Sequence, residues 1–430
     1  MTPLISFYFQ VHQPYRLRDL RIDEIGCGEP QYFDASKNRA VFRKVAEKCY
    51  LPANRLMLEL LESYPDFRIS YSLSGMFLDQ CREYGEDVLE SFRKLVTTGR
   101  VELLAETYYH SLSSLKSLAE FVTQVRKHTE AIQVLFGKTP SVFRNTELIY
   151  RNEIAHVARL MGFRGILAEG ADHLLRGRSP NEPFLPPTFR LSRDREGIIR
   201  KLRPLPRPAE QIHVLLKNYR LSDDVAFRFS DKSWVGFPLH AETFTDWLTG
   251  SGGHCVNLFM DYETFGEHQW ADTGIFDFLR ALPRIWQERG IRTATPSEVL
   301  AAWQREPKST QRYDAHNFIS WADMERDLSA WQGNRIQGAA LDAVYALEHA
   351  VKATGNPLLL EYWRRLQTSD HFYYMSTKYW SDGDVHKYFS PYESPYEAYR
   401  RYSHALCDLR QRVAAETGST PKKATRRKQR

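Results

Sequence analysis

The sequence predicts an α/β protein in which about seven parallel strands form a barrel-like sheet, followed by a C-terminal helical domain. Short apolar runs of strand length alternate with segments whose apolar residues recur every three or four positions, as they do in amphipathic helices. The short runs are nearly all apolar or β-branched, which is typical of parallel strands buried on both faces. Beyond about residue 300 only helical patterns continue.

The predicted strands all lie in the first two thirds of the chain. They are Leu4–Val11, Phe67–Leu73, Val101–Ala105, Ser141–Arg144, Arg164–Ala168, Ile212–Leu216 and Val256–Met260. Helices are predicted between them, for example at Pro52–Tyr64, Asp87–Thr97, Leu118–Phe136 and Ile154–Met161. Alternating strands and helices indicate a parallel sheet, and a count of about seven strands favours a barrel-like sheet over an open one.

Changes in composition predict the domain boundaries. Residues 1–300 are assigned to the barrel domain, and within it segment 179–208 holds seven prolines, which predicts a long loop or insertion near the rim of a cleft. Residues 301–416 carry helical apolar stripes and are predicted to form a helical domain that completes the cleft. Segment 417–430 is rich in lysine and arginine and is predicted to be a disordered basic tail.

Charge and cysteine content exclude several classes of partner. The net charge is +6, but much of it lies in the basic tail, so the body of the protein indicates no nucleic-acid partner. The five cysteines include no CxxC pair, which indicates neither a disulfide framework nor a thiolate metal site. No apolar run reaches the roughly 20 residues of a membrane helix, and the N-terminus reads as a strand, so a cytoplasmic location is expected.

Polar side chains follow four of the predicted strands at the point where each strand ends. They are His12 and Gln13 after the first strand, Glu102 and His110 in and after the third, Glu147 after the fourth and Asp261 after the seventh. The carboxyl ends of barrel strands carry the active site in α/β barrels. One such residue could simply cap a helix, but four strands that end at one mouth favour a functional site.

Two carboxylates from different strands suit the hydrolysis of a glycosidic bond. One must attack the anomeric carbon or activate water, and the other must protonate the leaving oxygen. A buried or negatively charged neighbourhood can keep that second group protonated near neutral pH. The carboxylates at the strand ends leave the choice of the two open: they are Glu102, Glu106, Glu147, Asp261, Glu263 and Glu267.

Four sequence runs resemble the first four regions of glycoside hydrolase family 57. These runs are FYFQVHQP, GRVELLAETYYHS, VFRNTELIY and LFMDYETFGEHQ, and WADMERDLSAWQGN is similar to a fifth. The resemblance covers nearly the whole chain up to the basic tail, and MDYETFGEH looks like the α-amylase-type branch. It implies a (β/α)7 barrel, a C-terminal helical region and a retaining mechanism with no metal or other cofactor.

The resemblance also implies roles for single residues. Glu147 matches the nucleophile and Asp261 the general acid/base, while His12 and Glu102 match residues that touch the sugar and support the site. Asp327 and Trp331 of the fifth region are expected to line the cleft. Among the residues outside these matches, Gln13, His110 and Trp270 are further candidates for substrate binding. Arg144-Asn145-Thr146 replaces the WxPE form of other branches, which leaves substrate specificity open.

The expected function is retaining hydrolysis of α-1,4-glucosidic bonds in an α-glucan or maltooligosaccharide. A 4-α-glucanotransferase or glycogen branching enzyme would use the same two carboxylates. A metal-dependent polysaccharide deacetylase is disfavoured because His12-Gln13-Pro14 lacks the aspartate of an HxD motif. A non-catalytic glucan-binding protein is disfavoured because both carboxylates are present. The sequence predicts no oligomeric state.

Overall fold

The computed structural model describes residues 2–202, 206–305, 311–378 and 389–418. The chain divides into two compact units. The first comprises Met1–Gln13 and Arg39–Leu328, and the second comprises Pro14–Asn38 and Ser329–Arg430. The predicted basic tail lies almost wholly outside the described residues, and Thr417, where it was expected to begin, is the last residue of a helix.

Seven parallel strands, counted among the described residues, form the centre of the first unit. They are β1 (Leu4–Val11), β2 (Ile69–Leu73), β3 (Val101–Leu103), β4 (Val142–Arg144), β5 (Gly165–Glu169), β6 (His213–Lys217) and β7 (Cys255–Asp261). They pair in two sheets, in the orders β3-β2-β1-β7 and β4-β5-β6. Ala105 joins the sheets, because it donates to Val142 (3.0 Å) and accepts from Arg144 (2.8 Å). The barrel-like fold class predicted from sequence is thereby confirmed.

The seam between β6 and β7 is closed differently, by part of the proline-rich segment. Phe184 exchanges two backbone hydrogen bonds with Val214 of β6, at 2.9 and 2.8 Å. The carbonyl of Asn181 accepts hydrogen bonds from His254 and Cys255 at the start of β7. Residues 181–185 therefore fill the seam, whereas the sequence indicated a loop near the rim of a cleft. The segment also contains a helix that was not predicted, α9 (Arg193–Lys201).

Side chains alternate between two apolar layers, as the two-residue period of a strand requires. Ile5, Phe7, Phe9 and Val11 of β1 belong to a large core shared with the surrounding helices. Tyr8, between them, belongs to an inner cluster with side chains of β4 to β7. Val299 and Leu300 belong to that inner cluster too, so α13 (Pro296–Arg305) covers the amino ends of the strands.

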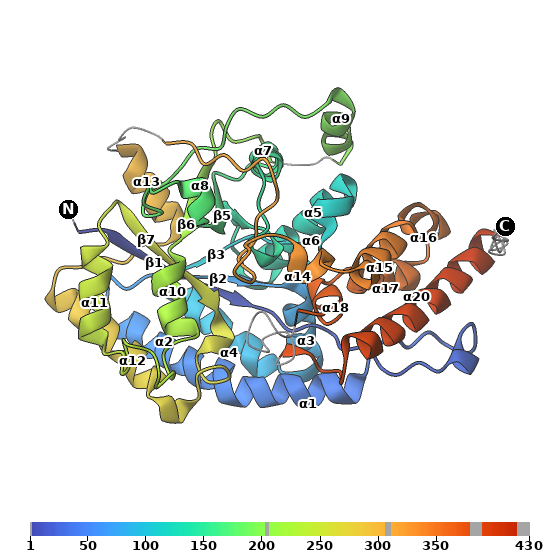
Figure 1. The fold of residues 1–430 in the computed structure, drawn as a ribbon, viewed down its shortest axis with the longest axis horizontal. Helices are drawn as coiled ribbons and strands as arrows, with labels where there is room; N and C mark the ends of the chain where they lie inside the picture. Colours follow the sequence, from blue (N-terminus) through green and yellow to red (C-terminus); the bar gives the residue numbers. More distant parts are fainter. Residues whose placement is uncertain (1, 203–205, 306–310, 379–388, 419–430) are drawn as a thin grey trace. The chain divides into compact units, whose positions relative to one another are not determined.

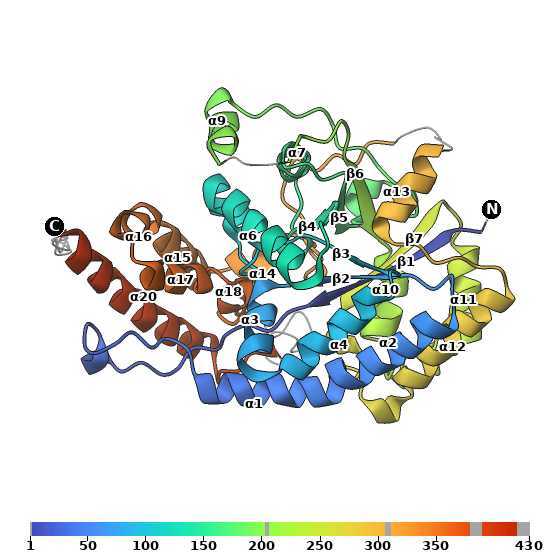
Figure 2. The same ribbon diagram turned by 180° about the vertical axis from the view of Figure 1, so that it is seen from behind.

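The helices of the first unit surround the strands. In Figures 1 and 2, α2, α4 and α12 lie below β1 and β2, while α6 and α7 lie above them. Their bounds are α2 (Leu51–Ser63), α3 (Gly75–Tyr84), α4 (Glu86–Thr97), α5 (Ser113–Lys116), α6 (Leu118–Phe136), α7 (Asn152–Leu160), α8 (Asp172–Leu175), α10 (Tyr219–Ala226), α11 (Ala241–Gly250) and α12 (Ile275–Glu288). Helix α1 (Ala35–Val45) begins in the second unit and continues into the first. A serine begins α3 and another begins α6, since Ser74 and Ser117 each accept a backbone N–H of the first turn.

The second unit is helical. It contains α14 (Ser329–Gln332), α15 (Arg335–Tyr345), α16 (Glu348–Thr354), α17 (Pro357–Arg365), α18 (Ser369–Tyr373) and α20 (Pro395–Thr417). Helix α20 contacts α15, α16 and α17 and buries Tyr402, Leu406, Leu409 and Val413, most of the apolar stripe that the sequence indicated.

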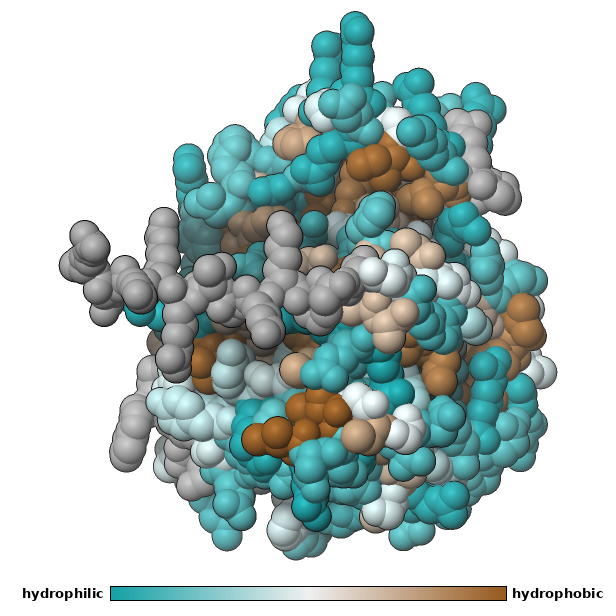
Figure 3. Space-filling view, turned by 90° about the vertical axis from the view of Figure 1, so that its right-hand side faces the viewer, coloured by the Kyte–Doolittle hydropathy of each residue, from teal (hydrophilic) through white to brown (hydrophobic). Residues whose placement is uncertain are grey.

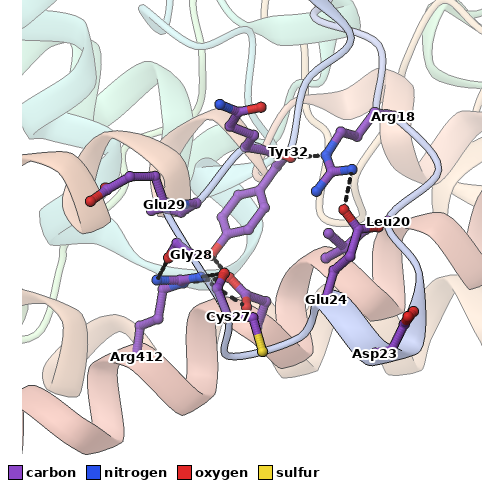
Figure 4. A pocket seen from close by; sticks show the side chains of 12 residues that line it. Arg18, Leu20, Asp23, Glu24, Cys27, Gly28, Glu29, Tyr32 and Arg412 are labelled. Atoms are coloured by element: carbon purple, nitrogen blue, oxygen red, sulfur yellow. Dashed lines mark hydrogen bonds and ion pairs between the residues drawn. The ribbon is translucent and has the colours of Figure 1, made fainter.

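A loop from near the N-terminus completes the second unit. The Tyr32 hydroxyl donates to Asp408 of α20 at 2.6 Å, and Arg400 pairs with Asp19. Figure 4 shows a pocket at this place, where Arg412 donates to the carbonyls of Gly28 and Cys27. These bonds explain why Pro14–Asn38 groups with the C-terminal helices, whereas the composition of the sequence predicts that the whole of 1–300 belongs to the barrel domain.

Residues 311–328 belong to the first unit rather than to the helical one. Tyr150 and Ile319 exchange backbone hydrogen bonds at 2.9 and 3.0 Å, and Leu185 donates to Gln311 at 2.9 Å. Such backbone pairing to loops of the barrel is not visible in a sequence pattern.

Within the described residues, no helix is long and apolar enough to cross a membrane. Hydrophilic residues predominate on the face of the molecule drawn in Figure 3, and apolar residues form separate patches there.

The seam between β6 and β7 yields a stability test. Asn181→Ala removes donors to Ser251 (3.1 and 3.2 Å) and Gly252 (3.1 Å) and an acceptor for Asn218 (3.0 Å). We expect the free energy of unfolding to fall by about 1–3 kcal/mol, because the buried Asn218 and the partly buried Ser251 and Gly252 lose their hydrogen-bond partner. Urea unfolding measures this change. The exposed Asn317 is the matched control, whose alanine variant should stay within about 0.5 kcal/mol of the wild type; equal effects would contradict the role of Asn181.

Candidate active site

Side chains from β1, the segment after β3, β4 and β7 meet at the carboxyl ends of the strands. His110 connects them: its ring stacks on His12 with centroids 4.0 Å apart, and its Nε2 lies 3.3 Å from Oε1 of Glu147. The negative charge of Glu147 acts on Asp261. Of the predicted residues, the structure thus brings His12, His110, Glu147 and Asp261 together.

Glu147 sits on a backbone turn directly after β4. It follows the strand in a short 3-10 helix, Thr146–Leu148, with φ 58° and ψ 25°. A left-handed conformation is unfavourable for a residue with a Cβ atom and tends to mark functional sites. The neighbouring Asn145 donates to the carbonyl of Ile149 at 2.9 Å, and Thr146 bonds Thr107 at 2.7 Å, which hold the turn. The Glu147 side chain is 19% exposed, so a ligand can reach it.

A fully buried carboxylate stands behind His110. Oε2 of Glu106 lies 2.9 Å from Nδ1 of His110, and its Oε1 accepts from Gln10 (3.1 Å) and Ser72 (2.9 Å). Burial alone would raise the pKa of Glu106, but the hydrogen bond and charge of His110 lower it to about 2. Burial alone would lower the pKa of His110, yet its hydrogen bonds to Glu106 and Glu147 raise it to about 9. At neutral pH His110 is therefore an imidazolium between two carboxylates.

His12 is held where β1 ends and α3 begins. Its Nδ1 lies 2.7 Å from Oγ of Ser74, the residue that caps α3. The same ring is stacked on His110 at an interplanar angle of 18°. His12 is partly exposed whereas His110 is buried, so His12 presents the outer ring of the pair.

Asp261 ends β7, and the pKa of its carboxyl group is raised above the usual value. Burial, and after it the negative charge of Glu147, raise the pKa of Asp261 to about 6, although Arg144 and His110 act in the opposite direction. A carboxyl group with this pKa keeps its proton in mildly acidic solution, while its partner Glu147 is bound by hydrogen-bond donors. The two carboxyl groups are thus differentiated by their surroundings.

A second carboxyl group lies two residues further on. Burial, and then the negative charge of Asp261, raise the pKa of Glu263 to about 8. Tyr50 donates a hydrogen bond to Glu263 and accepts one from Gln13 at 3.1 Å. Tyr50 ends a π-helical turn, Ala46–Tyr50, between α1 and α2. The predicted residue Gln13 therefore bonds to the Tyr50–Glu263 pair and is itself buried.

Sequence comparison identifies the family to which this arrangement belongs. The family profile described as "Glycosyl hydrolase family 57" matches residues 6–314. The chain belongs to glycosyl hydrolase family 57. The protein is accordingly a glycoside hydrolase. The family and the enzyme class predicted from the sequence are both confirmed.

Relatives of this family 57 protein carry more than one name. A protein of Methanocaldococcus jannaschii named "Putative alpha-amylase" is 41% identical over 416 residues, which cover 94% of this chain and 84% of that protein. A 4-alpha-glucanotransferase of Thermococcus kodakarensis is 25% identical over 145 residues, 34% of this chain and 22% of that protein. A solved GH57-type branching enzyme from Pyrococcus horikoshii aligns with a TM-score of 0.67 at 16% identity, over 98% of this chain and 92% of that one. This last likeness shows the fold alone.

Two further residues of this family 57 site have no clear signal in the sequence. Trp321 donates from Nε1 to Oε2 of Glu147 at 2.8 Å, although the two residues are 174 positions apart. Arg144 is fully buried, and its guanidinium lies 4.9 Å from the centre of the Trp321 ring. The only sequence signals were the position of Trp321 at the start of the fifth region and of Arg144 in the run that departs from WxPE.

Glu102 lies elsewhere in the barrel. Its carboxylate accepts a hydrogen bond from the backbone of Ser297 at 2.9 Å, in the first turn of α13, and burial raises its pKa. Glu102 and Glu106 are four residues apart, which is about 13 Å along a strand. The structure therefore places Glu106, and not Glu102, beside His110.

Three other candidates make contacts with other residues. Trp270 is 58% exposed, and its indole donates to the carbonyl of Glu267 at 3.1 Å. Asp327 is exposed and accepts through its backbone carbonyl from Ser320. Trp331 belongs to α14 of the second unit, where its ring lies 6.4 Å from that of Tyr373. Their roles toward a substrate stay predictions. Among the described residues, no three His, Cys, Asp or Glu side chains are grouped so that they could hold a metal ion.

The buried ion pair at this site can be tested without any substrate. Glu106→Gln should lower the pKa of His110 from about 9, because the variant removes the negative charge that stabilises the imidazolium. The ring nitrogen signals of His110, followed by NMR through a pH titration, measure the change. Glu102→Gln is the matched control, since Glu102 bonds to α13 and should leave this titration unaltered. An unchanged His110 titration in Glu106→Gln would rule out the ion pair.

Proposed function

We propose that this family 57 enzyme hydrolyses α-1,4-glucosidic bonds of α-glucans with retention of configuration. The observation that carries the proposal is the pair of unlike carboxyl groups at the mouth of the barrel. Glu147 is partly exposed and bonded to donors on both oxygens, while Asp261 has a pKa raised to about 6. The α-glucan substrate is supported by relatives named alpha-amylase and 4-alpha-glucanotransferase.

In the first step a carboxylate oxygen of Glu147 attacks the anomeric carbon. Asp261 donates its proton to the glycosidic oxygen, the bond to the leaving sugar breaks, and a glycosyl ester of Glu147 forms. The ester is neutral. The negative charge that helped to raise the pKa of Asp261 is therefore gone, and the pKa of Asp261 falls.

The fall in the pKa of Asp261 prepares this residue for the second step, the hydrolysis of the glycosyl ester. Asp261 has given up its proton, and its lowered pKa keeps it ionised. The Asp261 carboxylate then acts as the base and takes a proton from water as the water attacks the anomeric carbon. The ester bond breaks, Glu147 regains its negative charge, and the pKa of Asp261 rises again. His12, which is stacked on His110, would contact the sugar bound at this site.

Transfer of the glycosyl group to a sugar hydroxyl instead of water would use the same steps. The relatives named 4-alpha-glucanotransferase make this the second candidate activity. Chromatography of the products from maltoheptaose separates the two activities. Shorter chains alone indicate hydrolysis, and longer chains beside shorter ones indicate transfer.

The stereochemistry of the first product tests the double displacement. Two inversions at the anomeric carbon give an α-configured product before mutarotation begins. Proton NMR of the anomeric signals in the first minutes of the reaction measures this. Glu147→Gln should abolish turnover, which assigns the product to this site. A β-configured first product would refute the role of Glu147 as nucleophile.

The pH dependence tests the role of Asp261. The general acid must carry a proton, so kcat/KM for a natural glucan should fall as pH rises through about 6. Asp261→Ala should reduce this rate by roughly 10²–10⁴-fold. An aryl glycoside with a good leaving group needs little proton donation, so its glycosylation step should lose much less. Equal losses for both substrates would assign the acid role to another group.

A further inference from the structure

Trp321 contacts the candidate nucleophile at two points. Its indole Nε1 donates to Oε2 of Glu147 at 2.8 Å, and its backbone N–H donates to the Glu147 carbonyl at 3.2 Å. The other carboxylate oxygen, Oε1, is bonded to His110. One donor on each oxygen fixes the plane of the carboxylate, and the second bond ties the left-handed turn of Glu147 to the segment that carries Trp321.

Two buried cations lie over the ring of Trp321. The guanidinium carbon of Arg144 is 4.9 Å from the ring centre, and Nζ of Lys217 is 5.5 Å away. Both side chains are at least 96% buried. Within the described part of the chain, none of the three guanidinium nitrogens of Arg144 has a hydrogen-bond partner. The ring face is therefore a principal contact of this buried charge, because a cation is attracted to the electron-rich face of an indole.

The segment that carries Trp321 is anchored by a network of four charges. Arg326 donates to the carbonyl of Trp321 and lies 3.6 Å from both Glu169 and Asp223. Lys217 pairs with Asp223 at 2.8 Å and with Glu169 at 4.0 Å. These residues come from β5, β6, α10 and the Trp321 segment, so elements of the barrel on the side of β5 and β6 converge on this tryptophan.

We propose that Trp321 is a positioning residue for Glu147, held by the cations over its ring, and that its indole N–H keeps Oε2 in the orientation needed for attack. The proposal rests on the function proposed above, because it takes Glu147 as the nucleophile. The cations draw on the π electrons of the ring, which makes the N–H more polar and a stronger donor to a carboxylate.

Removal of this donor changes the acidity of Glu147 in a definite direction. A hydrogen bond to a carboxylate stabilises the charged form, so its loss raises the pKa of the carboxyl group. Glu147 interacts with the charges of His110 and Asp261, while Arg144 and Lys217 lie over the Trp321 ring and act on Asp261. A Trp321→Phe variant retains all four charged groups. The acid limb of kcat/KM should therefore move to higher pH in that variant.

The test compares two tryptophan-to-phenylalanine variants on maltoheptaose. Trp321→Phe keeps an aromatic face for the cations and loses the N–H, and kcat should fall roughly 10²-fold with KM nearly unchanged. Trp286→Phe is the matched control, since its indole donates to Thr245 at 3.1 Å in the core of the barrel's helical layer. It should retain the activity and the pH profile of the wild type.

The outcomes separate the positioning role from the proposed function. If Trp321→Phe behaves as Trp286→Phe does, or if its kcat falls while the acid limb stays in place, Trp321 does not position Glu147. A β-configured product from the wild type would instead overturn the proposed function, whatever Trp321→Phe does.

A second measurement does not require Trp321→Phe to fold. The protein has nine tryptophans, whose indole N–H signals can be observed by NMR. Of these, Trp321 is the one shown bonded to Glu147 within the described residues. In Glu147→Gln the indole bond loses its charged acceptor, so one indole proton signal should move upfield while the others stay. If no indole signal responds, the proposed bond is absent in solution and the inference fails.

Discussion

The buried imidazolium of His110 holds the mouth of the barrel together. It bonds Glu106 behind it and Glu147 in front of it, and it stacks on His12 beside it. Charges this deep are stable only as a matched set, because one left without its partner costs about 3–5 kcal/mol. The same set gives the two carboxyl groups of the reaction different surroundings. Glu147 is bonded to hydrogen-bond donors, whereas the pKa of Asp261 is raised by burial and by the negative charge of Glu147. The ion pairs of His110 thus favour the ionised form of Glu147, and the charge of Glu147 in turn favours the protonated form of Asp261.

The fold could be predicted from local patterns because each strand of a parallel barrel is buried on both faces. The observed strands lie within two or three residues of the predicted ones. The boundaries of the two units could not be found in this way. Pro14–Asn38 packs through side-chain bonds such as that of Tyr32 to Asp408, 376 residues away, and the proline-rich segment fills a seam through backbone bonds. Neither kind of contact leaves a periodic signal.

The site was predictable to the extent that it follows strand ends. Asp261 ends β7 and Glu147 lies on the turn after β4, so both were candidates, and the resemblance to family 57 implied their roles. The sequence could not distinguish Glu102 from Glu106, because the difference between them lies in their contacts in the folded protein. Glu102 bonds to the backbone of Ser297 in α13, whereas Glu106 bonds to His110. Trp321 reaches Glu147 from a segment without regular structure, so neither periodicity nor strand ends could identify it.

The pairing of β1 with β7 has a consequence for biosynthesis. Leu4 is the register partner of Cys255, so β1 is synthesised well before β7, and one of its edges lacks its strand partner in the interval. At about 5–20 residues per second that interval is roughly 10–50 s. During this time one edge of β1 carries unpaired backbone groups beside the apolar side chains of Phe7 and Phe9, the kind of edge that binds to other chains. Helix α2, whose side chains share a core with Phe7 and Phe9, is made long before β7 and can cover the apolar face of β1 in that interval.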